Sequence, residues 1–143
     1  MSSTPLIKEV VINAPVSKVW DAITKKEHMK HWYFDLAEFR AEPGFEFQFE
    51  GGKDPNNMYL HQCKVTESIP NKKLAYTWRY DGYEGDSLVT FELFDEGGKT
   101  RVVLTHSGLE TFPESNPDLA RHNFDEGWTY IIQKLLKEYL ENN

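Results

Sequence analysis

The spacing of apolar residues changes twice along the chain, and these changes predict where helices and strands lie. Leu6–Asn13 is a short run rich in β-branched residues, which suits a strand. After it, apolar residues recur at helical spacing in two short segments, from Pro15 to about Thr24 and from Lys26 to Trp32. The N-terminal part therefore predicts one strand followed by two short helices.

From Glu38 onward the apolar period shortens to two residues, which is typical of strands with one face in water. Short turns such as Pro70–Lys73 and Glu96–Lys99 separate these segments, and Gly51–Asn57 is predicted to be a loop. Because the connections are short, the strands are expected to form an antiparallel meander. The predicted strands are Phe45–Glu50, Met58–Ile69, Leu74–Tyr80, Leu88–Phe94 and Thr100–Ser107.

The C-terminal segment returns to helical spacing. Its apolar residues lie three or four positions apart, at Phe124, Trp128, Ile131, Leu135 and Tyr139. Asn116-Pro117 offers a cap and a first-turn proline, which predicts a helix of about 25 residues beginning there. At ~1.5 Å per residue, such a helix is long enough to cross a sheet of five or six strands.

This order of elements indicates one domain over residues 1–143. A twisted antiparallel sheet needs cover on its concave side, and the last helix is the element long enough to provide it. The predicted fold class is therefore α+β, with a curved antiparallel sheet of about six or seven strands wrapped around a long C-terminal helix and two short helices after the first strand.

Four segments in a fixed order resemble a known family. They are Ile12–Thr24, Lys64–Trp78, Val102–Leu109 and the stretch from Gly127-Trp128 to Leu135-Leu136. In these segments the chain resembles the START-like (SRPBCC) helix-grip superfamily, and within it the branch of homologues of the activator of heat shock protein 90 ATPase. The resemblance covers nearly the whole chain.

The resemblance implies a helix-grip fold with a cavity between the sheet and the long helix. Across the superfamily this cavity takes lipids, sterols, polyketides and other apolar ligands. The superfamily shares no catalytic residue that could be assigned here. The namesake's chaperone activity lies largely in a separate N-terminal domain, whereas this chain begins with the helix-grip segment. This weakens the co-chaperone interpretation. A chaperone partner, with a role in the stress response, is therefore only an alternative.

Aromatic residues make up 14% of the chain, so much of its apolar surface consists of rings. Rings fill cores in every fold, and they also line pockets for small apolar ligands. Strand alternation and helical spacing place eight candidates on the surfaces that enclose the expected cavity. The predicted ligand-binding residues are Phe47, Tyr76, Trp78, Phe91, His106, Trp128, Ile131 and Leu135.

Each of these residues also has a purely structural interpretation. His106 is a candidate to orient a ligand or exchange a proton near neutral pH, or it is a core histidine hydrogen-bonded to neighbouring backbone. Tyr76, Trp78 and Trp128 are candidates for pocket walls, or they pack against one another as plain core. Both interpretations stay open at the level of the sequence.

Other reactive side chains give no recognisable site. His28 and His31 lie three residues apart on a predicted helix, but no third ligand follows at a known spacing, so no metal site is predicted. Cys63 lies on an alternating strand and is interpreted as an inert apolar residue. We expect no cofactor and assign no catalytic residue.

The net charge and the hydropathy of the chain argue against several classes of binding partner and against a membrane span. The net charge is −7 and there is no basic tract, which argues against nucleic acid and anionic membrane surfaces. No apolar run approaches the ~18 residues of a membrane span, and the N-terminus lacks the features of a signal peptide, so a cytoplasmic protein is expected.

The function predicted from the sequence is binding of an apolar small molecule (lipid, sterol-like or polyketide-like) without catalysis. Two alternatives remain. One is a cofactor-independent cyclase or aromatase-like enzyme, in which His106 moves protons together with Tyr76 or another tyrosine of the same cavity. The other is a chaperone-accessory protein that acts through its surface.

Overall fold

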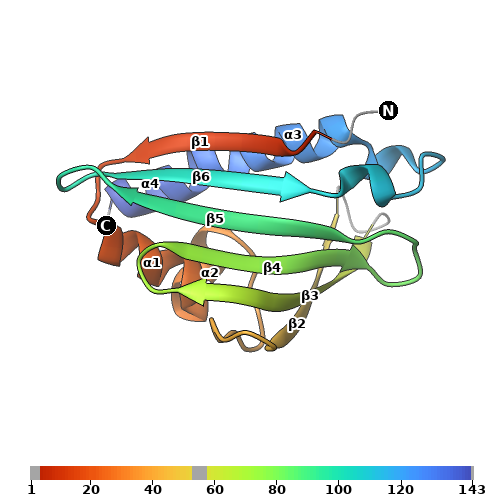
Figure 1. Cartoon of the computed structure of the whole chain (residues 1–143), viewed down its shortest axis with the longest axis horizontal. Coiled ribbons are helices and arrows are strands. Elements are labelled where there is room, and N and C mark those ends of the chain that lie inside the picture. Colours follow the sequence, from red (N-terminus) through yellow and green to blue (C-terminus); the bar gives the residue numbers. More distant parts are fainter. Residues whose placement is uncertain (1–3, 53–57, 143) are drawn as a thin grey trace.

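Six strands form one antiparallel sheet in the computed structural model, which describes residues 4–52 and 58–142 (Figure 1). The order across the sheet is β1-β6-β5-β4-β3-β2, so five consecutive strands form a meander and the first strand pairs with the last. This confirms the predicted fold class. The strands are β1 (Leu6–Ile12), β2 (Glu46–Gly52), β3 (Met58–Ile69), β4 (Lys73–Tyr80), β5 (Ser87–Asp95) and β6 (Thr100–Ser107).

Residues that alternate along each strand form the buried face of the sheet. In β6, Val102, Leu104 and His106 are buried while their neighbours are partly exposed. The register places these residues beside buried residues of β5, with Leu104 opposite Phe91 and His106 opposite Val89. Rows of buried side chains therefore run across strands, as the alternation predicts.

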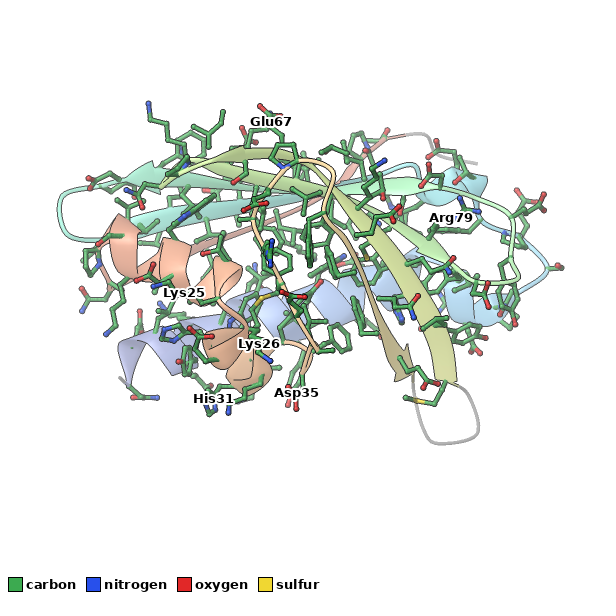
Figure 2. All side chains as sticks on the ribbon, turned by 90° about the horizontal axis from the view of Figure 1, so that it is seen from below. Lys25, Lys26, His31, Asp35, Glu67 and Arg79 are labelled. Atoms are coloured by element: carbon green, nitrogen blue, oxygen red, sulfur yellow. The ribbon has the colours of Figure 1, made fainter. Side chains whose placement is uncertain are left out.

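A β-bulge between Val65 and Glu67 interrupts the pairing of β3 with β4. Bulges bend a strand and increase its twist. Beyond this point β2 and β3 curl down beside the helical layer, as Figure 2 shows. This curl forms the side wall of the space beneath the sheet.

The predicted loop Gly51–Asn57 is wrong at its first two residues, because β2 continues through Gly51 and Gly52, which pair with Tyr59 and Met58. A Cβ added at Gly51 would lie 2.9 Å from Cε1 of Phe34. Glycine at this position therefore lets the ring of Phe34 lie against the strand backbone. The rest of that predicted loop, 53–57, lies outside the described residues.

The two short helices after β1 agree with the sequence prediction. They are α1 (Val16–Thr24) and α2 (Lys26–Trp32). Val19, Ala22 and Ile23 form the buried side of α1. The indole Nε1 of Trp32 donates to the carbonyl of Ala22 at 2.8 Å, which fixes the angle between the two helices.

The long C-terminal helix begins later than predicted. Asn116 caps a separate 3₁₀ turn, η2 (Pro117–Leu119), by accepting a hydrogen bond from the backbone N–H of Asp118 at 3.0 Å. Ala120 is extended (φ −73°, ψ 148°) and separates this turn from the helix. A second 3₁₀ turn, η1 (Leu109–Thr111), follows β6.

The helix itself consists of α3 (Arg121–Tyr130), a π-helical segment η3 (Ile131–Leu136) and α4 (Lys137–Glu141), which follow one another without a break. It lies behind β1 and β6 in Figure 1 and beneath the sheet in Figure 2. Polar side chains on it also bond to the edge strand. Gln133 Nε2 donates to the carbonyl of Glu9 at 2.9 Å, and Lys137 Nζ donates to the carbonyl of Val11 at 2.8 Å.

A chain of buried hydrogen bonds joins α3 to three strands. Trp128 Nε1 donates to Nδ1 of His106 at 2.9 Å, so Nδ1 carries no proton. His106 Nε2 therefore carries the proton and donates to Ser87 Oγ at 2.8 Å, and Ser87 Oγ donates to the carbonyl of Trp78 at 2.6 Å. The four residues leave no unpaired donor in the chain.

Replacing Trp128 by alanine is expected to lower the free energy of unfolding by about 3–5 kcal/mol. Trp128 is 3% exposed, and its loss also leaves Nδ1 of His106 without its donor. Urea titration at pH 7 measures the effect. Tyr130→Ala on the same helix is the control, because Tyr130 is 53% exposed. A loss below about 1 kcal/mol for Trp128→Ala would contradict the packing described here.

Candidate functional site

A pocket of about 330 Å³ lies between the strands β2–β4 and helix α3. Seven of its fourteen lining residues carry aromatic rings, namely Phe34, Tyr59, His61, Trp78, Tyr80, Phe124 and Trp128. The remaining seven are Gly51, Gly52, Asp118, Leu119, Asn123, Gly127 and Ile131. Such a lining, half of it aromatic residues with a few polar groups, is typical of a site for a small apolar ligand.

Gly127 keeps the helical side of the pocket open. It lies between Phe124 and Ile131, three and four residues away, on the side of the helix that lines the pocket. A Cβ added to Gly127 would meet nothing within 4 Å. Glycine inside a helix costs stability relative to alanine, and no close contact in the described structure requires it here.

A hydrogen-bonded cluster closes one end of the pocket. Tyr59 Oη donates to Oδ2 of Asp118 at 2.7 Å, and this bond raises the pKa of Tyr59. Asn116 Nδ2 donates to the same hydroxyl at 3.4 Å. The cluster fastens strand β3 to the η2 turn, and thereby fixes the residues just before α3.

His61 is a neutral ring in the strand wall. Burial lowers its pKa to about 4, so it is uncharged at pH 7. Because a carbonyl oxygen can only accept, the contact of 2.9 Å to the carbonyl of Tyr59 identifies Nδ1 as the protonated nitrogen. The ring stacks on Phe49, with centroids 4.6 Å apart, and meets the ring of Trp78 edge-on at 4.9 Å.

Tyr80 brings a hydroxyl group into the same wall. Trp78 Nε1 donates to the Tyr80 hydroxyl at 2.9 Å. Burial raises the pKa of Tyr80 above its ordinary value, so the hydroxyl keeps its proton throughout the physiological range. The rings of Tyr80 and His61 lie 4.8 Å apart.

The structure separates the eight predicted ligand-binding residues into two groups. Trp78, Trp128 and Ile131 line the pocket. The other five do not line it: Phe47, Tyr76, Phe91 and His106 are buried in the core, and Leu135 is partly buried against it. Their proposed contact with a ligand stays a prediction.

The contacts of His106 are those of a core histidine, the second of its two interpretations. It is fully buried, and both ring nitrogens are bonded within the chain. Its partners are the side chains of Ser87 and Trp128, where the sequence suggested neighbouring backbone. Burial lowers the pKa of His106 to about 3, so the ring is neutral at pH 7.

Sequence reasoning missed several lining residues. Tyr59, His61 and Tyr80 continue the alternation of β3 and β4 toward the strand ends, so extending that pattern would have found them. Phe34 carries no such signal, because it lies between α2 and β2 outside any helix or strand. In the sequence, Gly127 indicates only a position of low helix propensity, and nothing there shows that it lines a pocket.

The candidate histidine pair belongs to a contact with the last helix. His28 Nδ1 lies 2.6 Å from Oη of Tyr139, and the ring of His31 stacks on the same tyrosine with centroids 5.5 Å apart (Figure 2 labels His31). Within residues 4–52 and 58–142 no group of three or more His, Cys, Asp or Glu side chains is arranged to hold a metal ion. In the same residues no helix combines the length and apolarity needed to cross a membrane.

The family is settled by comparison of the sequence with family models. The model described as activator of Hsp90 ATPase homolog 1-like protein matches residues 13–141. The chain belongs to this family. No match was found among curated protein sequences.

Solved structures similar to this activator of Hsp90 ATPase homolog 1-like chain span nearly its whole length. Protein MLL2253 from Mesorhizobium loti is 25% identical, with 98% of each chain covered and a TM-score of 0.79. BH1534 from Bacillus halodurans is 27% identical, with 96% of this chain and 97% of that chain covered and a TM-score of 0.74. The Aha1 dimer from Colwellia psychrerythraea is 23% identical, with 96% of each chain covered and a TM-score of 0.69.

Acid is expected to destabilise the protein through His61 and His106. Their pKa values fall from 6.5 to about 4 and about 3 on folding, so the unfolded chain takes up protons that the folded chain does not. The stability is fully present above pH 6.5 and is lost as the pH falls through the folded values. At pH 5 each histidine should cost about 2 kcal/mol. Urea titrations at pH 7 and pH 5 measure the loss, and equal midpoints would contradict it.

Gly127→Ala is expected to raise the free energy of unfolding of this domain by about 1 kcal/mol. The added methyl group meets no atom within 4 Å, so helix propensity should decide the sign. Thermal and urea denaturation at pH 7 measure the change. A lower midpoint than that of the wild type would show that the helical side of the pocket is closed at this position.

Proposed function

We propose that this protein binds a compact apolar small molecule, largely aromatic, in the pocket between β2–β4 and α3. The observation that carries the proposal is a ring-lined pocket kept open by a glycine in the middle of a helix. Its volume of about 330 Å³ lies near the lower end of the range for small-molecule sites. This favours fused rings of polyketide-like size over a long lipid chain.

The ionisable groups of the strand wall support binding without catalysis. A general acid or base works best with a pKa near the operating pH. Burial moves His61 and Tyr80 away from neutrality in opposite directions, so neither is suited to exchange a proton at pH 7. His106, which the enzyme hypothesis uses, is bonded at both nitrogens inside the core.

Gly127→Leu is expected to abolish binding of naphthalene, the probe for this test. The leucine side chain would project into the open space beside Gly127 and occupy the volume that a ring would take. Binding is measured by saturation-transfer NMR and by the rise in melting temperature with probe concentration. Glu126→Leu introduces the same side chain at the neighbouring exposed position and should leave binding unchanged.

Two results would overturn the proposal. One is naphthalene binding to Gly127→Leu as tightly as to the wild type, and the other is no binding to the folded wild-type protein. Native mass spectrometry of freshly purified protein adds an independent observation, because a resident apolar ligand would raise the mass of the wild type and be absent from Gly127→Leu.

The family description favours a second candidate function, stimulation of a chaperone ATPase through the protein surface. The same variant separates the two. If the surface acts, Gly127→Leu should stimulate the ATPase of a purified Hsp90-type chaperone as well as the wild type does, whereas a ligand-dependent action would be lost with the pocket.

A further inference from the structure

Most of the hydrogen-bond donors on the aromatic side chains of the pocket wall already have an acceptor among the described residues, and one does not. Trp128 Nε1 donates to His106, Tyr59 Oη donates to Asp118, and His61 Nδ1 donates to the carbonyl of Tyr59. Trp78 Nε1 donates to the hydroxyl oxygen of Tyr80. Within the described part of the chain, the Tyr80 hydroxyl accepts this bond and has no acceptor for its own proton.

Tyr80 is placed to offer that proton to a ligand. It is the last residue of β4, is 5% exposed and lines the pocket. Its ring packs against those of His61, at 4.8 Å, and Tyr59, at 5.7 Å, and these neighbouring rings hold it in place. A ligand oxygen beside this hydroxyl would accept its proton and form a hydrogen bond.

Trp78 strengthens the hydroxyl as a donor. A hydroxyl group that accepts one hydrogen bond is polarised and donates a second more strongly. The bond of 2.9 Å from Trp78 Nε1 has this effect, and it also fixes the hydroxyl oxygen beside the indole ring. Trp78 thus acts as a positioning residue for Tyr80.

We propose that Tyr80 donates a hydrogen bond to an acceptor oxygen of the ligand, and that the pocket selects neutral aromatic ketones and quinones over aromatic hydrocarbons of the same shape. This inference rests on the proposed function, since it names the chemical class of the ligand for the same pocket. Selectivity follows because a site built to donate a hydrogen bond discriminates against analogues that lack the acceptor.

The test compares two probes of nearly equal shape, 2-acetonaphthone and 2-isopropenylnaphthalene, which differ by a carbonyl oxygen in place of a methylene group. Their dissociation constants are measured by NMR titration on the wild type and on Tyr80→Phe. The preference for the ketone, taken as the ratio of the two constants, should fall about fivefold in Tyr80→Phe, the size of one neutral hydrogen bond. Comparing this ratio between the wild type and Tyr80→Phe cancels the different hydration of the two probes.

Tyr83→Phe is the matched control. Tyr83 is 40% exposed and does not line the pocket, so removing its hydroxyl should leave the ratio unchanged. An equal ratio in the wild type and Tyr80→Phe would overturn the inference, and so would an equal fall in Tyr83→Phe.

Infrared spectroscopy of bound 2-acetonaphthone gives a measurement that needs no variant. The carbonyl stretch should lie at lower frequency in the wild-type complex than in an aprotic solvent, because a hydrogen bond weakens the C=O bond. An unshifted band would overturn the inference even if Tyr80→Phe failed to fold.

The failures of the two proposals are distinguishable. If neither probe binds the folded wild type, the proposed function is wrong. If both bind, are blocked by Gly127→Leu and show no dependence on Tyr80, the pocket binds ligands but Tyr80 does not recognise them.

Discussion

The hydrogen bond from Trp128 to His106 fixes the long helix against the sheet, and the pocket depends on it. The bond continues through Ser87 to the backbone of Trp78, so one buried chain sets the spacing between α3 and the middle of the sheet. Trp78 and Trp128 are also walls of the pocket. Their rings can serve as apolar surface there because both indole N–H groups are bonded inside the protein, Trp128 to His106 and Trp78 to Tyr80.

The same constraint explains the electrostatics of the site. A histidine that accepts a hydrogen bond from an indole at Nδ1 must be neutral, and burial keeps His106 so. Burial among the rings of Phe49 and Trp78 lowers the pKa of His61 and keeps it neutral too. The wall formed by the sheet is therefore without charge at neutral pH, although His61 lies in it and His106 lies behind it in the core. Such a wall favours neutral rings over ions because burying an unpaired charge is costly.

Strand alternation predicted most of this architecture, because a sheet with one buried face imposes a period of two wherever it packs. It placed Trp78 and His106 on the buried face, and the short turns predicted the antiparallel meander of the last five strands. Features that depend on the end of a strand or on empty space could not be predicted. Phe34 belongs to no regular element. Gly51 lies within β2, and the Phe34 ring lies too close to its backbone for a Cβ. The long helix begins after Ala120 because Asn116 caps a separate turn.

Gly127 shows why a site can be invisible to pattern reasoning. Periodicity reports what a side chain packs against, and the significance of Gly127 lies in the absence of any atom within 4 Å of its missing Cβ. A helix residue that lowers helix stability and relieves no clash has no structural compensation at its own position. The proposed ligand would use the open space beside Gly127. The hydrogen bond from Trp128, one residue away, holds the helix on the sheet although Gly127 lowers its helix propensity.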